Sequence, residues 1–127
     1  MNKDETRQNY LEAIYFISLK NHDVRAIDIA EYLNFSRPTV SIALKQLASE
    51  DYITITNNKI KLTEKGHVEA YRMYERHNMI AKIFMELGVD EKTAYHDSCM
   101  IEHDLSDVTF EAIKKAYHKY LELRKDS

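Results

Sequence analysis

The sequence predicts a mainly α-helical fold, with a winged helix-turn-helix in the N-terminal half and helices alone in the C-terminal half. Three observations lead to this fold class. Apolar residues recur with a helical period along most of the 127 residues, and the chain has only two glycines and one proline. One pair of alternating segments, on either side of Asn57 and Asn58, is typical of a β-hairpin.

The bulk composition limits the class of protein. A chain of 15.0 kDa forms one ordinary domain or two small helical subdomains. The net charge of −3 gives no overall cationic field, so any nucleic-acid binding must use a local patch. The single cysteine excludes an internal disulfide, and no apolar run approaches the roughly 18 residues of a membrane span. We therefore expect a cytoplasmic protein with a reduced thiol and no membrane partner.

The first three helices are predicted at residues 4–20, 26–33 and about 37–50. Ser36 is the expected N-cap of the third helix, and Pro38 lies in its first turn, where a missing N–H is tolerated. Two short helices joined by a tight turn at 34–35 are typical of a helix-turn-helix that reads DNA.

A β-wing is predicted from strands at 52–56 and 59–62, because Asn tolerates the backbone conformation of a two-residue hairpin turn. Residues 36–65 carry five basic and three acidic side chains, a local balance of +2 in a net acidic chain. This surplus indicates where phosphate contacts would form. An ordinary solvated surface explains the same surplus equally well.

A long helix is predicted from Glu64, after the capping Thr63, to about Leu87, with Gly88 beyond its end. A further helix begins near Val89 and carries residues 95–105, and a last one follows Ser106. These helices are too few to enclose a good core, which indicates dimerisation through them. The expected domains are 1–70 for DNA binding and 71–127 for dimerisation and metal binding.

A candidate metal site centres on residues 95–105. On a continuous helix, Cys99, Glu102 and His103 would leave one face, as thiolate, carboxylate and imidazole. One helix rarely completes a coordination shell, so other ligands must come from elsewhere. The candidates are His77 on the long helix and Glu12 on the first, with Asn9 one turn before Glu12. The alternatives are a buried structural cysteine, surface carboxylates and half-buried, hydrogen-bonded histidines. His96 is assigned to the second shell or the surface.

The chain resembles the diphtheria toxin repressor and manganese transport regulator family of metal-dependent bacterial repressors. The resemblance covers nearly the whole chain, and the segments that carry it are residues 9–15, 27–33, 36–41, 62–66, 77 and 101–106. It implies a homodimer that binds double-stranded operator DNA and represses metal-uptake genes once Fe(II) or Mn(II) is bound. It also implies Glu12, His77, Glu102 and His103 as metal ligands, with Cys99 at the ligand position one turn ahead of Glu102.

Two positions depart from the manganese branch of that family. Cys99 stands where that branch has a carboxylate, and Asn9 stands where it has an aspartate. A thiolate favours softer or borderline ions, so Fe(II) is the predicted ion, with Mn(II) or Zn(II) close behind.

The leading hypothesis is a metal-responsive, homodimeric winged-helix repressor. The expected DNA contacts are Ser36, Arg37, Pro38, Thr39, Ser41, Lys45, Lys59 and Lys61. A second hypothesis is a metal-independent winged-helix regulator that senses oxidants through Cys99 or takes an organic ligand. A third, a small metalloenzyme, is disfavoured because the chain lacks the loop residues that usually build a hydrolytic pocket.

Overall fold

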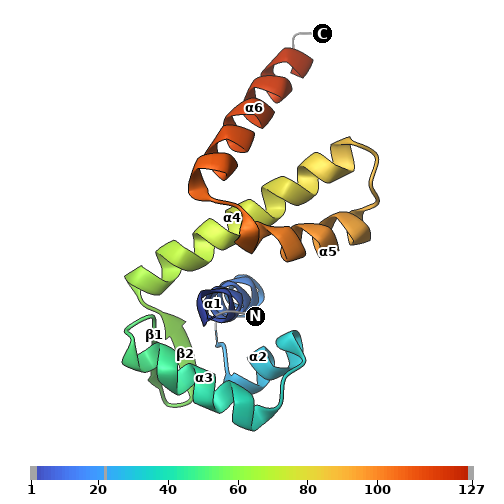
Figure 1. Ribbon diagram of the computed structural model, residues 1–127. Coiled ribbons are helices and arrows are strands. Elements are labelled where there is room, and N and C mark those ends of the chain that lie inside the picture. Colours follow the sequence, from blue (N-terminus) through green and yellow to red (C-terminus); the bar gives the residue numbers. More distant parts are fainter. Residues whose placement is uncertain (1–2, 22, 126–127) are drawn as a thin grey trace. The chain divides into compact units, whose positions relative to one another are not determined.

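The computed structural model describes residues 3–21 and 23–125 (Figure 1). The chain divides into two compact units, Met1–Tyr74 and Glu75–Ser127. Helix α4 (Glu64–Glu86) runs from the first unit into the second. In the described ranges, no helix is both long and apolar enough to span a membrane.

The first unit contains α1 (Lys3–Lys20), α2 (Ala26–Leu33), α3 (Arg37–Ser49), strands β1 (Ile53–Thr56) and β2 (Lys59–Leu62), and the start of α4. Apolar residues from the three helices and the hairpin form its core; they include Leu11, Ile14, Ile29, Val40, Leu44, Ile53 and Ile60. The unit is therefore the winged helix-turn-helix that the periodicity predicts.

Helix α3 begins where its sequence predicts. The Ser36 hydroxyl accepts a hydrogen bond from the Thr39 backbone N–H at 3.3 Å, and Pro38 lies in the first turn. The preceding turn contains Asn34 in the left-handed region, with φ of 59°. Val40, Leu44 and Leu47 are buried, so one face of α3 is fixed against the core.

The wing is an antiparallel hairpin in which Ile53 pairs with Leu62 and Thr56 with Lys59. Asn57 and Asn58 have φ of 53° and 64°, as expected for the two central residues of a type I′ turn. Val24 forms an isolated bridge to Ile60, which ties the wing to the segment before α2.

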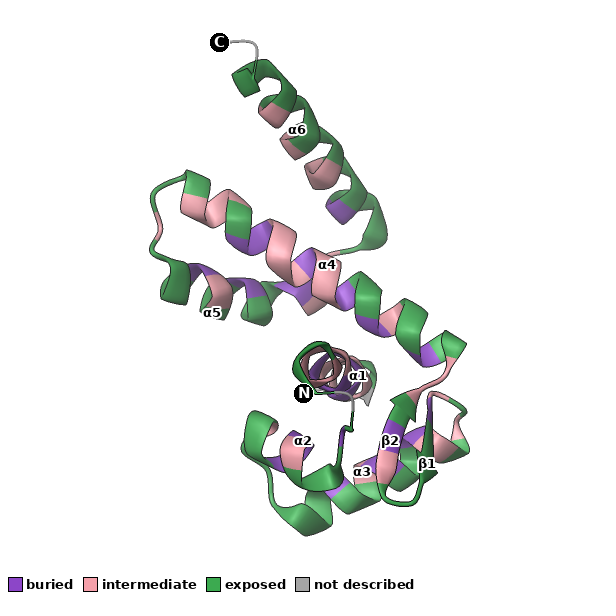
Figure 2. Cartoon of the chain, turned by 180° about the vertical axis from the view of Figure 1, so that it is seen from behind, coloured by how far each residue is buried: buried purple, intermediate pink, exposed green. Residues whose placement is uncertain are grey.

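The second unit contains the rest of α4, then α5 (Glu91–Ile101), a 3₁₀ turn η1 (Glu102–Asp104) and α6 (Asp107–Lys125). Asp90 caps α5 by accepting from the Thr93 N–H at 3.0 Å, and Gly88 after α4 has φ of 101°. The buried apolar residues are few, among them Ile80, Ala81, Ala94 and Phe110. Figure 2 shows that α6 is mostly exposed along its length.

Replacing Gly66 by alanine should destabilise the fold, although alanine is the better helix former. An added Cβ would lie 2.0 Å from the Tyr52 carbonyl oxygen, and backbone cannot swing aside as a flexible side chain can. The overlap should cost about 2 kcal/mol, more than the roughly 1 kcal/mol gained in helix propensity. Urea unfolding of Gly66→Ala measures the difference.

Gly88→Ala is the matched control, since an added Cβ there meets no atom within 4 Å and only the positive φ opposes it. We expect it to be about 1 kcal/mol less stable than wild type. A Gly66→Ala protein as stable as wild type, or more stable, would show that the Tyr52 contact relaxes freely.

Candidate metal centre and nucleic-acid interface

The Glu102 carboxylate is the centre of the candidate metal site. Its residue is 0% exposed, whereas a default glutamate would lie at the surface. The predicted continuous helix through residues 99–103 is wrong. Helix α5 ends at Ile101, and Glu102 begins the 3₁₀ turn, so Cys99 and Glu102 do not share one α-helical face. The turn carries Glu102 inward while Cys99 stays exposed.

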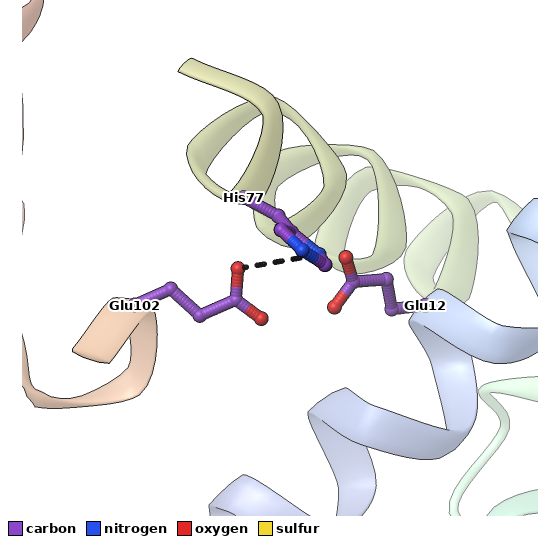
Figure 3. Close-up of side chains that lie close together, drawn as sticks. All are labelled: Glu12, His77 and Glu102. Atoms are coloured by element: carbon purple, nitrogen blue, oxygen red, sulfur yellow. Dashed lines mark ion pairs between the residues drawn. The ribbon is translucent and has the colours of Figure 1, made fainter. Parts of the chain in front are cut away.

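His77 faces this carboxylate from α4. Its Nδ1 lies 3.9 Å from Glu102 Oε2 (Figure 3), and its Nε2 lies 3.2 Å from the Tyr95 carbonyl oxygen. A carbonyl oxygen only accepts, so Nε2 donates to it, and Nδ1 is the ring nitrogen that faces Glu102. This nitrogen and the carboxylate oxygen are both of the donor types that divalent metal ions take in proteins.

Further contacts hold the His77 segment in place. The Ser98 hydroxyl donates to the His77 carbonyl at 2.9 Å, and the His77 and Tyr95 rings meet edge to face at 5.5 Å. Helix α5 therefore orients His77 through its side chain and its backbone. His77 is half-buried and hydrogen-bonded, which is also what a purely structural histidine would show.

His103 lies on the other side of the carboxylate. Its Nε2 is 3.3 Å from Glu102 Oε1, and its side chain is 4% exposed. Glu102 thus lies between two imidazoles, one from α4 and one from its own turn. The two histidines contact different oxygens of this carboxylate, and imidazole and carboxylate are donor types that suit Mn(II), Fe(II) and Zn(II).

The remaining predicted ligands are placed separately. Cys99 is exposed on α5, so the alternative of a buried structural cysteine is wrong. Glu12, which Figure 3 also labels, is 9% exposed on α1 of the first unit, and Asn9 is half-buried on the same helix. His96 is exposed, as the surface assignment expects.

Arg76, which the sequence analysis missed, supports the turn that carries Glu102. Its residue is 3% exposed, and its guanidinium donates to the carbonyl oxygens of Glu102 at 3.3 Å and Leu105 at 2.9 Å. It also pairs with Asp107 and lies 4.9 Å above the Phe110 ring. Only its position next to His77 could have drawn attention to it, because its partners lie 26 to 34 residues further along.

The predicted DNA contacts lie on α3 and the wing. Ser36, Arg37, Pro38, Thr39, Ser41, Lys45 and Lys61 are exposed, and Lys59 is half-buried beside Asp23 at 3.5 Å. The Ser36 and Thr39 hydroxyls bond to each other at 2.8 Å. A hollow of about 610 Å³ is lined partly by Arg25, Arg37, Ser41 and Lys45. Arg25 was not among the predicted contacts, because it precedes residues 36–65, where the local surplus of basic side chains lies.

Comparison with known proteins agrees with this architecture. Residues 4–60 match the model of the iron dependent repressor N-terminal DNA-binding domain, and residues 63–122 match its metal-binding and dimerisation domain. An HTH-type transcriptional regulator of Methanocaldococcus jannaschii, described as uncharacterized, is 37% identical over 121 residues, covering 89% of this chain and 93% of its own. The transcriptional regulator MntR of Salmonella typhimurium is 33% identical over 109 residues, covering 85% of this chain and 69% of that regulator.

Solved structures share the fold. The manganese regulator SloR superimposes with a TM-score of 0.77 at 29% identity, over 88% of this chain and 53% of that one. The metal-dependent transcriptional regulator MtsR superimposes with a TM-score of 0.81 at 24% identity, again over 88% of this chain and 53% of that one. At this identity the likeness supports the fold alone. The chain therefore spans about half the length of these solved regulators.

Arg76→Met should loosen the second unit. The substitution keeps an unbranched apolar side chain but leaves two carbonyl oxygens and Asp107 without their guanidinium partner, a loss of about 2 kcal/mol or more. Urea unfolding, followed by far-UV circular dichroism, measures this loss.

Arg124→Met is the control, because the Arg124–Glu86 pair at 2.5 Å is largely exposed, so that solvent screens it and its loss should change stability little. Equal stability losses in the two variants would contradict the structural role assigned to Arg76.

Proposed function

The chain belongs to the iron-dependent repressor family, also known as the diphtheria toxin repressor and manganese transport regulator family, and we propose that it represses transcription as a metal-activated homodimer. In this proposal residues 1–70 read operator DNA, and residues 71–127 dimerise and bind the metal. The observation that carries the proposal is the buried Glu102 carboxylate between His77 and His103.

The proposed ligands are Glu12, His77, Glu102 and His103, with Cys99 and Asn9 as further donors. Support comes from the donor chemistry: Nδ1 of His77 faces a buried carboxylate, and a divalent ion would neutralise that carboxylate. When bound, the ion supplies positive charge and coordination bonds that fix its ligands relative to one another.

Different observations favour different ions. The thiol of Cys99 favours Fe(II) or Zn(II), and its exposure leaves it accessible to an ion. The names of MntR and SloR associate those relatives with manganese, which favours Mn(II) for this chain. We propose that Cys99 determines the ion preference. If the Cys99 thiolate coordinates the ion, Fe(II) is the cognate ion; if it does not, Mn(II) is.

DNA recognition is assigned to α3 and the wing. Helix α3 presents Pro38, Thr39 and Ser41 on its exposed side, in the position from which a recognition helix enters the major groove. Arg37, Lys45 and Lys61 supply positive charge for phosphates, and Ser36 and Lys59 complete the proposed contact set. The proposed targets of this repressor are genes of metal homeostasis.

The homodimer is proposed to form through the second unit. A groove of about 350 Å³ between α4 and α6 is lined by apolar residues, among them Ile83, Leu87 and Ile113. Leu87 and Leu123 are 76% and 63% exposed, although side chains of this kind are usually covered. A second copy of the chain would bury these side chains and supply the core that the second unit lacks.

A metal-independent regulator that senses oxidants is the second candidate, because Cys99 is exposed as a redox-sensing thiol must be. It does not account for the buried carboxylate between two imidazoles. Under this candidate, peroxide would change DNA binding in wild type but not in Cys99→Ser, and chelators would have no effect.

Glu102→Ala should abolish the metal response. Fe(II) or Mn(II) should raise the affinity of the wild-type protein for its DNA by about ten-fold or more, because the coupling free energy between an effector site and a second binding site typically changes affinity by a factor of this size. The variant should bind DNA weakly whether metal or chelator is present. Anaerobic fluorescence-anisotropy titrations with Fe(II), Mn(II), Zn(II) and Co(II) provide the measurement.

Glu86→Gln controls for the loss of a carboxylate, since Glu86 is partly exposed and pairs with Arg124 rather than with the candidate ligands. It should respond to metal as wild type does. If neither chelation of the metal nor Glu102→Ala changes the affinity for DNA, metal activation is refuted.

Cys99→Asp should move the ion preference toward manganese. Exchanging a thiolate for a carboxylate favours the harder ion, so the ratio of Mn(II) to Fe(II) concentrations at half-saturation should fall. Competition with a metal-sensitive dye gives both affinities without DNA. Met100→Ala, at a neighbouring exposed residue of α5, should leave the ratio unchanged. An unchanged ratio in Cys99→Asp would remove Cys99 from the ligand set.

A further inference from the structure

Ile42 is an apolar residue at the centre of the exposed face of α3. It is 71% exposed, more than any other large apolar residue described in the first unit. Val40 and Leu44, two positions to either side, are buried. At about 100° per residue, Ile42 therefore points roughly opposite to the side of α3 that packs on the core.

The surroundings of Ile42 are polar and suited to DNA. Thr39, Lys45 and Gln46 are exposed on the same helix, within one turn of Ile42. The cations Arg25, Arg37 and Lys45 line the adjoining hollow. This charge complements a phosphate backbone, whereas Ile42 itself has no atom that could bond to a phosphate or to a base edge.

We propose that Ile42 is a specificity residue that packs against the C5 methyl group of a thymine in the major groove of the operator. This inference rests on the proposed function, because it requires α3 to enter the groove. Hydrogen bonds dominate readout of the major groove, and the thymine methyl is the apolar group that a standard base pair presents there. An isoleucine at the centre of the reading face therefore selects T over C, which lacks the methyl.

The test begins with the duplex selected by the metal-loaded wild-type protein from a random-sequence DNA library. Each thymine of that duplex is then replaced by deoxyuridine, which differs only in lacking the methyl. Wild-type affinity should fall about four-fold at one position in each half-site, as expected for one methyl group returned to water. In Ile42→Ala the same replacement should have no effect.

Val68→Ala is the matched control, since Val68 is a β-branched residue of the first unit that is 62% exposed on α4. It should keep the wild-type sensitivity to deoxyuridine. Wild-type binding that is indifferent to every thymine methyl would overturn the proposal, as would methyl sensitivity that persists in Ile42→Ala. Failure of the metal-loaded protein to select any DNA would instead overturn the proposed function.

Discussion

The fully buried Glu102 carboxylate is the constraint around which the second unit is arranged. A buried carboxylate needs compensating groups, and two imidazoles lie beside it, His77 at 3.9 Å and His103 at 3.3 Å. Nε2 of His77 donates to the Tyr95 carbonyl oxygen, which leaves Nδ1 as the nitrogen that faces the carboxylate. The position of α5 against α4 therefore determines which nitrogen of His77 faces Glu102.

The same stretch of α4 holds the turn that carries the carboxylate. Carbonyl groups at the end of a helix lack intrahelical partners, and here the Arg76 guanidinium binds those of Glu102 and Leu105. Arg76 also pairs with Asp107 in the first turn of α6. Adjacent residues of α4 thus contact the carboxylate and its backbone, so a change in the position of η1 would also affect the start of α6.

Local sequence signals predicted the first unit well, because its turns depend on residues adjacent in the chain. Ser36 and Pro38 mark the start of α3, and Asn57 and Asn58 mark the wing. The end of α5 was not predictable in this way, since no glycine or proline follows Ile101 and the partner that stabilises the turn, Arg76, is distant in sequence. Burial of Glu102, exposure of Cys99 and exposure of Ile42 are tertiary properties that periodicity alone does not give.

A metal proposed to join Glu12 of the first unit to His77 and Glu102 of the second would act through a free-energy difference. The ion changes DNA affinity only by its preference for the DNA-binding arrangement of the units, and a hundred-fold effect requires about 2.7 kcal/mol of that preference. One coordination bond that forms in only one arrangement can supply a difference of this order. Donors confined to the second unit would bind the ion equally in every arrangement. Under the proposed function, metal regulation would therefore require a ligand from the first unit, for which Glu12 is the leading candidate.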